Sequence, residues 1–270
     1  MADARDALDF GGRVVLVTGG TRGIGRVIAD RFAAAGATVV VCGRRPPEAD
    51  ADAGADAGND TDAGGPAFLA CDVRDPDQVD ALVEAVVGEH GRLDHVVNNA
   101  GGSPEAEAST ASPRFSEAII RLNLLAPLHV AQAANRVMQA QATGGSIVNV
   151  ASVSGTRPSP GTAAYGAAKA GLLSLTQTLA MEWGPRVRVN AVVAGMVRTD
   201  DAWPAYGGEA GIARVNATIP LGRMAEPAEV AGAVLFLASP LASYVSGAAL
   251  EVHGGGEPPA FKVVGDGPPA

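Results

Sequence analysis

Short apolar runs alternate with longer amphipathic stretches along most of the chain. Several of the short runs are apolar at every position, as in strands that are buried on both faces. The predicted strands are Arg13–Thr18, Thr38–Cys42, Ala67–Ala70, Leu93–Asn98, Ser146–Val150, Val187–Val192 and Ala248–Val252. The predicted helices, each long enough for a crossover connection, are Gly23–Ala35, Pro76–His90, Ser116–Gln141, Ala163–Trp183 and Pro227–Ala238. This alternation predicts an α/β fold with one doubly wound parallel sheet and helices on both faces.

Three segments depart from the alternation. Residues 50–65 contain five aspartates and almost no large apolar side chain, which predicts a mobile acidic surface loop. Residues 196–220 form an irregular stretch after a predicted strand, where a loop covers a ligand at the carboxyl edge of a sheet. Residues 253–270 form a Gly- and Pro-rich tail that either docks on another subunit or stays disordered. We therefore expect residues 1–270 to form one domain.

Composition and charge narrow the class of protein. With 270 residues, of which 47% are hydrophobic, the chain can bury a full core. Its net charge of −9 opposes binding to nucleic acid or to anionic lipid. The opening segment, MADARDALDFGG, has acidic residues where a signal peptide is basic, and no long apolar run follows. We expect a cytoplasmic protein that binds neither nucleic acid nor membrane.

Cysteine is scarce, and its pattern is not that of a metal site. Cys42 and Cys71 are the only cysteines, and neither belongs to a CxxC pair or to a histidine cluster. This usage disfavours a disulfide framework and a structural zinc site. Two reduced, buried thiols are the prediction.

A glycine-rich turn follows the first predicted strand. Gly19, Gly23 and Gly25 lie between that strand and the first predicted helix. Glycines at this place let the backbone approach a dinucleotide pyrophosphate, and the helix amino end supplies N–H donors. A tight strand–helix turn also needs glycine for conformational reasons alone, so the turn by itself leaves both interpretations open.

Tyr165 and Lys169 are the first candidates for catalysis. They are four residues apart in a predicted helix, so their side chains lie on one face. An ammonium group near a phenol favours the phenolate, which predicts a lowered pKa for Tyr165. The spacing also occurs by chance in many helices, and its context decides its meaning.

That context resembles a known family. TGGTRGIG at residues 18–25, NNAG at residues 98–101, and Tyr165 with Lys169 resemble the short-chain dehydrogenase/reductases of the one-domain type. The resemblance extends from about Phe10 to Gly256 and includes the 3-oxoacyl-(acyl carrier protein) reductases, although it does not choose among the family's substrates. It implies a Rossmann-type fold and an oxidoreductase that transfers a hydride between a nicotinamide cofactor and a carbonyl or alcohol substrate.

The resemblance also implies which cofactor is bound. Gly43 replaces the acidic residue that holds the ribose 2′-hydroxyl in NAD enzymes, whereas Arg44 and Arg22 can bind a 2′-phosphate. NADP(H) is therefore expected, with solvated loop charges as the alternative for Arg44. The other implied cofactor contacts are Gly19, Thr21, Gly23, Ile24 and Gly25 in the turn, Asp72 and Val73 at the adenine, Asn99, Ala100 and Gly101 at the ribose, Val197 and Thr199 near the carboxamide, and Tyr165 and Lys169. An ordinary polar strand end is the alternative for Asp72.

Four residues carry the chemistry in this resemblance. Tyr165 would donate a proton to the substrate carbonyl oxygen, and Ser152 would hydrogen-bond that oxygen. Lys169 would bind the nicotinamide ribose and tune Tyr165. Asn123 would hold a water that links Lys169 to solvent, or alternatively it would tie down a helix kink. No metal is implied.

Two residues depart from the family pattern, and a further set is expected to face the substrate. Ala194 stands where proline is common, which predicts a looser loop over the nicotinamide, and His253 replaces a common aspartate. The candidate substrate-facing residues are mostly small or apolar and indicate a neutral or lipophilic carbonyl compound: Gly102, Ser103, Val153, Thr156, Met196, Trp203 and Tyr206.

Partners and rival functions follow from the same features. The resemblance implies a homotetramer built on the Ala- and Leu-rich helices, or a dimer. One rival function is a catalytically silent NADPH-binding sensor or scaffold, which retention of the four catalytic residues disfavours. A second rival is an NAD-dependent alcohol or hydroxysteroid dehydrogenase, which Arg44 disfavours.

Overall fold

The computed structural model describes residues 8–47, 65–199 and 206–258. The predicted acidic loop up to residue 64, Trp203 and residues 259–270 of the predicted tail lie outside these ranges. No helix within them is long and apolar enough to cross a membrane.

A seven-stranded sheet forms the middle of the described chain, and every neighbouring pair of its strands is parallel. Its order is β3-β2-β1-β4-β5-β6-β7, so the sheet grows outward in both directions from β1 and β4. The strands are β1 (Val14–Thr18), β2 (Thr38–Gly43), β3 (Ala67–Ala70), β4 (His95–Asn98), β5 (Gly145–Ser152), β6 (Val187–Ala194) and β7 (Ala249–Val252). The predicted doubly wound parallel sheet is confirmed.

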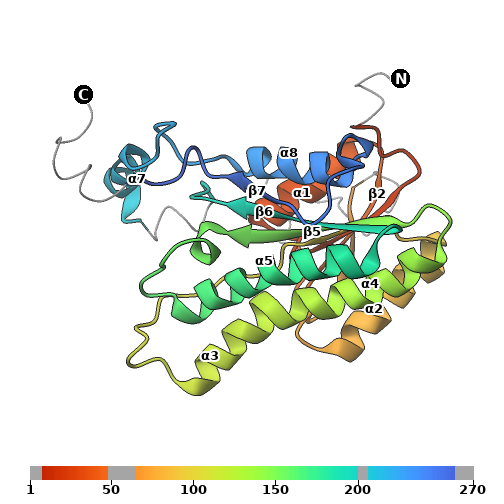
Figure 1. Cartoon of the computed structure of the whole chain (residues 1–270), viewed down its shortest axis with the longest axis horizontal. Coiled ribbons are helices and arrows are strands. Elements are labelled where there is room, and N and C mark those ends of the chain that lie inside the picture. Colours follow the sequence, from red (N-terminus) through yellow and green to blue (C-terminus); the bar gives the residue numbers. More distant parts are fainter. Residues whose placement is uncertain (1–7, 48–64, 200–205, 259–270) are drawn as a thin grey trace, which may run out of the picture.

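Helices cover both faces of this sheet (Figure 1). On one face, α1 (Gly23–Ala34) and α8 (Pro227–Ala238) bury apolar side chains such as Phe32 and Val230. On the other face, α2 (Pro76–His90), α4 (Ala126–Ala140) and α5 (Ala163–Trp183) pack over Leu16 and Val96. Because each layer excludes water from one side of the sheet, the central strands are apolar throughout, as the sequence pattern predicts.

The predicted long helix Ser116–Gln141 differs from the structure in two ways. The helical region begins earlier, with α3 (Pro113–Ile120), because Ser112 caps it by accepting a hydrogen bond from the Phe115 N–H at 3.2 Å. A π-helical segment, η3 (Arg121–Leu125), then separates α3 from α4. A π-bulge of this kind changes the direction of the side chains that follow it and is common at functional sites.

The prediction of an irregular stretch over residues 196–220 is wrong for part of this range. Residues Gly208–Ala217 form α7, a helix that lies beside the carboxyl edge of the sheet (Figure 1). The adjacent pair Gly207 and Gly208 suggested a loop, but with φ angles of 76° and 73° these glycines turn the chain into the helix. Residues 218–220 return to irregular structure.

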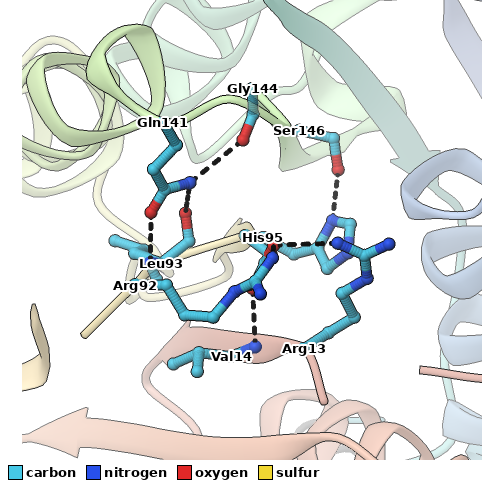
Figure 2. Close-up of polar contacts among 9 residues, drawn as sticks. Arg13, Val14, Arg92, Leu93, His95, Gln141, Gly144 and Ser146 are labelled. Atoms are coloured by element: carbon cyan, nitrogen blue, oxygen red, sulfur yellow. Dashed lines mark hydrogen bonds and ion pairs between the residues drawn. The ribbon is translucent and has the colours of Figure 1, made fainter. Parts of the chain in front are cut away.

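A buried polar cluster lies at the amino edge of the sheet (Figure 2). The Asp94 carboxylate accepts hydrogen bonds from Val14 N–H at 2.9 Å and from Arg92 Nε at 2.7 Å, and it also pairs with Arg13. His95 follows directly and contacts the Ser146 hydroxyl at 2.8 Å. These contacts join the first residues of β1, β4 and β5, and they lie at the amino edge, opposite to the carboxyl ends of the strands.

The His95 ring packs among aromatic side chains. Its centroid lies 5.3 Å from that of Phe10 and 6.4 Å from that of Phe32. Burial therefore lowers the pKa of His95 to about 4 and keeps the ring neutral at physiological pH.

Candidate active site

A cavity of about 510 Å³ lies where the central strands end at the carboxyl edge of the sheet. Every catalytic and cofactor-binding residue predicted from the sequence lines this cavity except Asn123. Its lining comes from the turn after β1, the ends of β2 and β3, the loop after β4, the end of β5 and helix α5. Parallel strands bring these segments together because their carboxyl ends meet at one edge.

The glycine turn is held by hydrogen bonds across the cavity floor. The Asn99 amide donates to the carbonyl oxygens of Thr18 and Gly19, each at 3.1 Å. In return, the Thr18 hydroxyl accepts from the N–H groups of Asn99 and Ala100. A Cβ atom at Gly25 would lie 2.3 Å from both the Asn99 amide and the Gly19 carbonyl oxygen, so this approach requires glycine.

Helix α1 begins at this turn with donors that no side chain caps. Arg22 occupies the N-cap position, and its side chain makes no capping hydrogen bond. The first N–H groups of the helix therefore point toward the cavity end that Gly23 and Ile24 line. Such an amino end favours an anion through both its donors and its dipole.

Charged side chains gather at one end of the cavity. Arg44, Asp72 and Arg74 line it together, with Arg44 from the segment after β2 and the other two from the segment after β3. Arg74 Nε donates to the Asp72 carboxylate at 2.9 Å, and this hydrogen bond lowers the pKa of Asp72. Arg74 thus neutralises the carboxylate that faces Arg44, a pairing that the sequence analysis missed.

Ser152, Tyr165 and Lys169 converge at the other end. Ser152 is the last residue of β5, and the other two residues lie one turn apart on α5. Lys169 Nζ lies 5.6 Å from the centroid of the Tyr165 ring. Tyr165 lines this end of the cavity together with Ser152.

The electrostatics of this triad differ from the prediction. Burial raises the pKa of Tyr165 above its ordinary value, and the hydrogen bond with Ser152 only partly offsets this. The predicted lowering of the Tyr165 pKa by Lys169 is therefore wrong for the protein alone. Burial also lowers the pKa of Lys169 to about 8, while Nζ donates to the Val150 carbonyl oxygen at 2.8 Å.

Asn123 lies behind the cavity wall in the π-helical segment and is fully buried. Its amide donates to the carbonyl oxygens of Gly102 and Ile119, each at 3.0 Å, and its Oδ1 accepts from the Gly102 N–H at 2.9 Å. The side chain thus joins η3 to the loop after β4. This arrangement matches the alternative of a buried asparagine that ties down an irregular helix.

A second cavity of about 220 Å³ adjoins the first at Gly195. Of the predicted substrate-facing residues, Val153, Thr156 and Met196 line it. Gly102 lines the larger cavity, Tyr206 lies in a neighbouring groove with Met196, and Ser103 hydrogen-bonds the Pro104 carbonyl oxygen instead.

The second cavity is more polar than predicted. Arg157, His253 and Glu257 also line it, and Arg157 pairs with Glu257 across one side. Arg157 lies between a short helical turn and a proline, and Glu257 comes from the segment after β7. No local pattern connects these two residues, since they are distant in the chain.

The two departures from the family pattern lie close together. Ala194 is the last residue of β6 and pairs with Val252, and His253 packs against Gly195. A bridge between Val197 and Ala225 holds the start of the following loop. Residues 200–205 of this loop lie outside the described residues, so the looser loop stays a prediction.

Comparisons with known proteins agree with this geometry. The family described as enoyl-(acyl carrier protein) reductase matches residues 19–257, which include all residues that line the two cavities. The 3-oxoacyl-(acyl carrier protein) reductase of Vibrio cholerae is 37% identical over 249 residues, covering 92% of this chain and 98% of that protein.

Two further similarities are informative. An uncharacterized short-chain type dehydrogenase/reductase of Sinorhizobium fredii is 41% identical over 248 residues, and the match spans 90% of this chain but only 43% of that protein. The ligand-free structure of aldohexose dehydrogenase from Thermoplasma acidophilum superposes with a TM-score of 0.82 at 31% identity. That match covers 93% of this chain and 95% of the other.

Proposed function

Because this chain belongs to the short-chain dehydrogenase/reductase family, we propose that it is an NADPH-dependent reductase that converts a ketone or 3-oxoacyl-type carbonyl to an alcohol. The observation that carries this proposal is the layout of the 510 Å³ cavity. A proton donor and its partners lie at one end, and an arginine-rich site lies at the other. Oxidoreductase chemistry follows from the family, whereas cofactor preference, reaction direction and residue roles are our proposal.

The residues present fit a dinucleotide cofactor that carries a 2′-phosphate. The amino end of α1 suits a pyrophosphate, and Gly25, where a side chain would clash, lines the cavity beside it. Arg44 and Arg22 would hold a 2′-phosphate, and Gly43 offers no carboxylate to repel it. Arg74 supports this choice because it already neutralises Asp72. When bound, the reduced nicotinamide supplies the hydride that reaches the carbonyl carbon.

The chain itself supplies the proton and orients the carbonyl. Because burial raises the pKa of Tyr165, its hydroxyl keeps its proton at neutral pH and can give it to the substrate oxygen as negative charge develops there. Ser152 hydrogen-bonds the same oxygen. Lys169, with its pKa near 8, is charged at neutral pH and stabilises the Tyr165 oxygen after the proton has left.

Asn123 is a positioning residue in this scheme. Its side-chain amide bonds two backbone carbonyl groups, which fixes the irregular turn η3 beside Gly101 and Lys169. A water that replenishes the proton of Lys169 would then be held by the main chain of this turn rather than by the side chain.

For the assembly, we propose a homotetramer, with a dimer as the alternative, in the cytoplasm. Met181 on α5 is 86% exposed and Leu125 at the end of η3 is 38% exposed, so the α4–α5 layer presents apolar surface that a second copy would cover. Light scattering of the purified protein at micromolar concentration would give the number of subunits.

A cofactor titration and a substrate panel test the proposed function. Binding of NADPH and of NADH is followed by the fluorescence of the reduced nicotinamide. Turnover is then measured against a β-ketoacyl thioester, a keto steroid, a diketone and a quinone. We expect NADPH to bind at least about tenfold more tightly than NADH, since charge-assisted hydrogen bonds contribute about 1.5–3 kcal/mol.

The rival functions predict different results. Preference for NAD with oxidation of alcohols or sugars would indicate a dehydrogenase, like the aldohexose dehydrogenase that shares this fold. Tight NADPH binding without turnover of any carbonyl compound would instead favour a silent sensor or scaffold.

A further inference from the structure

Two thiols lie side by side at the arginine-rich end of the cavity. Cys42 is the penultimate residue of β2 and Cys71 follows the last residue of β3. In the parallel register Cys42 faces Leu69, so Cys71, two residues further on, points to the same face of the sheet. The Cys71 N–H donates to the Gly43 carbonyl oxygen at 2.9 Å, which continues the ladder past the strand end.

Both thiols are reduced, and both belong to the cavity wall. Their residues are 0% and 3% exposed, and both line the cavity together with Arg44 and Asp72. Both side chains pack in the same apolar cluster beneath the sheet edge. The mechanism proposed above uses neither thiol, although each directly precedes a segment that binds the cofactor there.

The two thiols are electrostatically unequal. The hydrogen bond from Cys42 lowers the pKa of Cys71, although burial and the nearby carboxylates of Asp72 and Asp75 oppose this. The same hydrogen bond, together with burial, raises the pKa of Cys42 well above its usual value. Of the two thiols, Cys71 therefore loses its proton the more readily, and it is the better candidate for the nucleophile.

We propose that Cys42 and Cys71 form a redox-modification site in which a hydroperoxide converts the dithiol to a disulfide and thereby weakens cofactor binding. The Cys71 thiolate attacks the peroxide oxygen, giving a sulfenic acid while the O–O bond breaks and, for hydrogen peroxide, water leaves after protonation. The Cys42 sulfur then attacks the Cys71 sulfur, and the sulfenic hydroxyl leaves as a second water. Two thiols are oxidised by two electrons and one peroxide is reduced to two waters.

Disulfide geometry explains the effect on the cofactor. Cys71 lies diagonally across from Cys42, because Cys42 pairs with Leu69, so an S–S bond of about 2.05 Å between them draws the ends of β2 and β3 toward each other. The segments Gly43–Arg44 and Asp72–Val73 continue directly from these residues. Oxidation would therefore displace the proposed contacts with the 2′-phosphate and adenine, and a bound cofactor would cover the thiols and protect them.

The test compares reduced and peroxide-treated protein and rests on the proposed cofactor site. After treatment with hydrogen peroxide, peptide mapping should recover a Cys42–Cys71 cross-link that is about 2 Da lighter than the two thiol peptides. The Kd for NADPH should rise at least about tenfold and return after dithiothreitol, because breaking the cross-link restores the strand ends. Saturating NADPH during the treatment should prevent the cross-link.

Single-cysteine variants provide the matched controls. In Cys71→Ser, which lacks the attacking thiol, peroxide should give no cross-link and leave the NADPH affinity unchanged. In Cys42→Ser, peroxide should oxidise Cys71 to a sulfenic acid without forming the cross-link. The inference is overturned if wild-type protein keeps two free thiols, or if the cross-link forms and NADPH affinity does not change. Reduced protein that binds neither NADPH nor NADH would instead refute the proposed function, and peptide mapping would still decide whether the thiols couple.

Discussion

At the scale of single residues, burial rather than charge pairing sets the protonation states of Tyr165 and Lys169. Tyr165 and Lys169 lie on one helix face, as predicted. The pKa of each is shifted in the direction that favours its neutral form. The spacing in the sequence could show that these residues meet. It could not show the direction of the Tyr165 shift, because that depends on how much of the chain covers the ring.

The lowered pKa of Lys169 predicts a pH dependence for carbonyl reduction. Tyr165 keeps its proton far above neutral pH, so the first group to lose a proton as the pH rises is Lys169, with a pKa of about 8. We therefore expect kcat/KM for reduction to be level below pH 8 and to fall above it. In Lys169→Arg the cation persists, and residual activity should show no fall near that pH. A wild-type profile that stays level through pH 9 would contradict the role of Lys169.

Arg44 and Arg45 offer a comparison for cofactor choice. Arg44 lines the cavity, whereas its neighbour Arg45 does not. Arg44→Ala should weaken NADPH binding at least about tenfold, because a charge-assisted hydrogen bond to the 2′-phosphate is lost, and should barely change NADH binding. Arg45→Ala should affect neither cofactor. Equal weakening of both cofactors in Arg44→Ala, measured by fluorescence titration, would show that Arg44 only supports the loop.

At the scale of elements, the apolar pattern predicted the helix bounds that depend on local sequence. The bounds of α2, α5 and α8 agree with prediction because each has clear end signals, such as Asp75, which caps α2, and Gly91, which ends it with φ of 72°. Helix α7 was missed because a glycine pair at its start has the same appearance as a loop. The π-helical turn was missed because it is fixed by contacts between Asn123 and Gly102, which lie on different elements.

The glycine turn is an element whose packing can be tested directly. Gly25→Ala would place a Cβ 2.3 Å from the Asn99 amide and from the Gly19 carbonyl oxygen, so the turn must shift. We expect NADPH affinity to fall at least about tenfold together with a lower Tm. Gly88→Ala is the control, since an added Cβ there meets nothing within 4 Å beyond the neighbouring backbone of α2 among the described residues. That substitution should leave cofactor affinity unchanged and stabilise the helix by up to about 1 kcal/mol.

Normal NADPH affinity in Gly25→Ala would show that the turn can relax without losing its function. The comparison with Gly88→Ala separates this effect from any general consequence of adding a methyl group to a helix.

At the scale of the whole molecule, the two edges of the sheet serve different purposes. The carboxyl edge gathers the cavity residues, and every predicted catalytic and cofactor-binding residue except Asn123 is among them, whereas no motif indicated other lining residues such as Cys71 and Arg74. The amino edge holds the buried Asp94–His95 cluster, which no motif indicated (Figure 2). Its partners, Arg13 and Ser146, are distant in sequence, so only the strand order brings them together.

This cluster predicts a loss of stability in mild acid. His95 titrates near pH 4 in the folded protein and near pH 6.5 when unfolded. Between these values the unfolded state binds more protons, so the free energy of unfolding decreases as the pH falls. From pH 7.5 to pH 5 we expect a loss of about 2 kcal/mol in urea unfolding from this residue. In His95→Gln, which does not titrate, the difference between the two pH values should shrink by that amount, and an unchanged difference would contradict the assignment.

The central claim is that Tyr165 gives the proton that accompanies hydride transfer from NADPH to a carbonyl carbon. The most direct measurement is the rate of NADPH oxidation by wild type and by Tyr165→Phe with the best substrate of the panel, with NADPH affinity measured on the same samples. Loss of one positioned general acid should lower kcat by at least about 100-fold while the Kd for NADPH stays within about twofold, because the ring remains in place. Turnover by Tyr165→Phe at the wild-type rate would contradict the account.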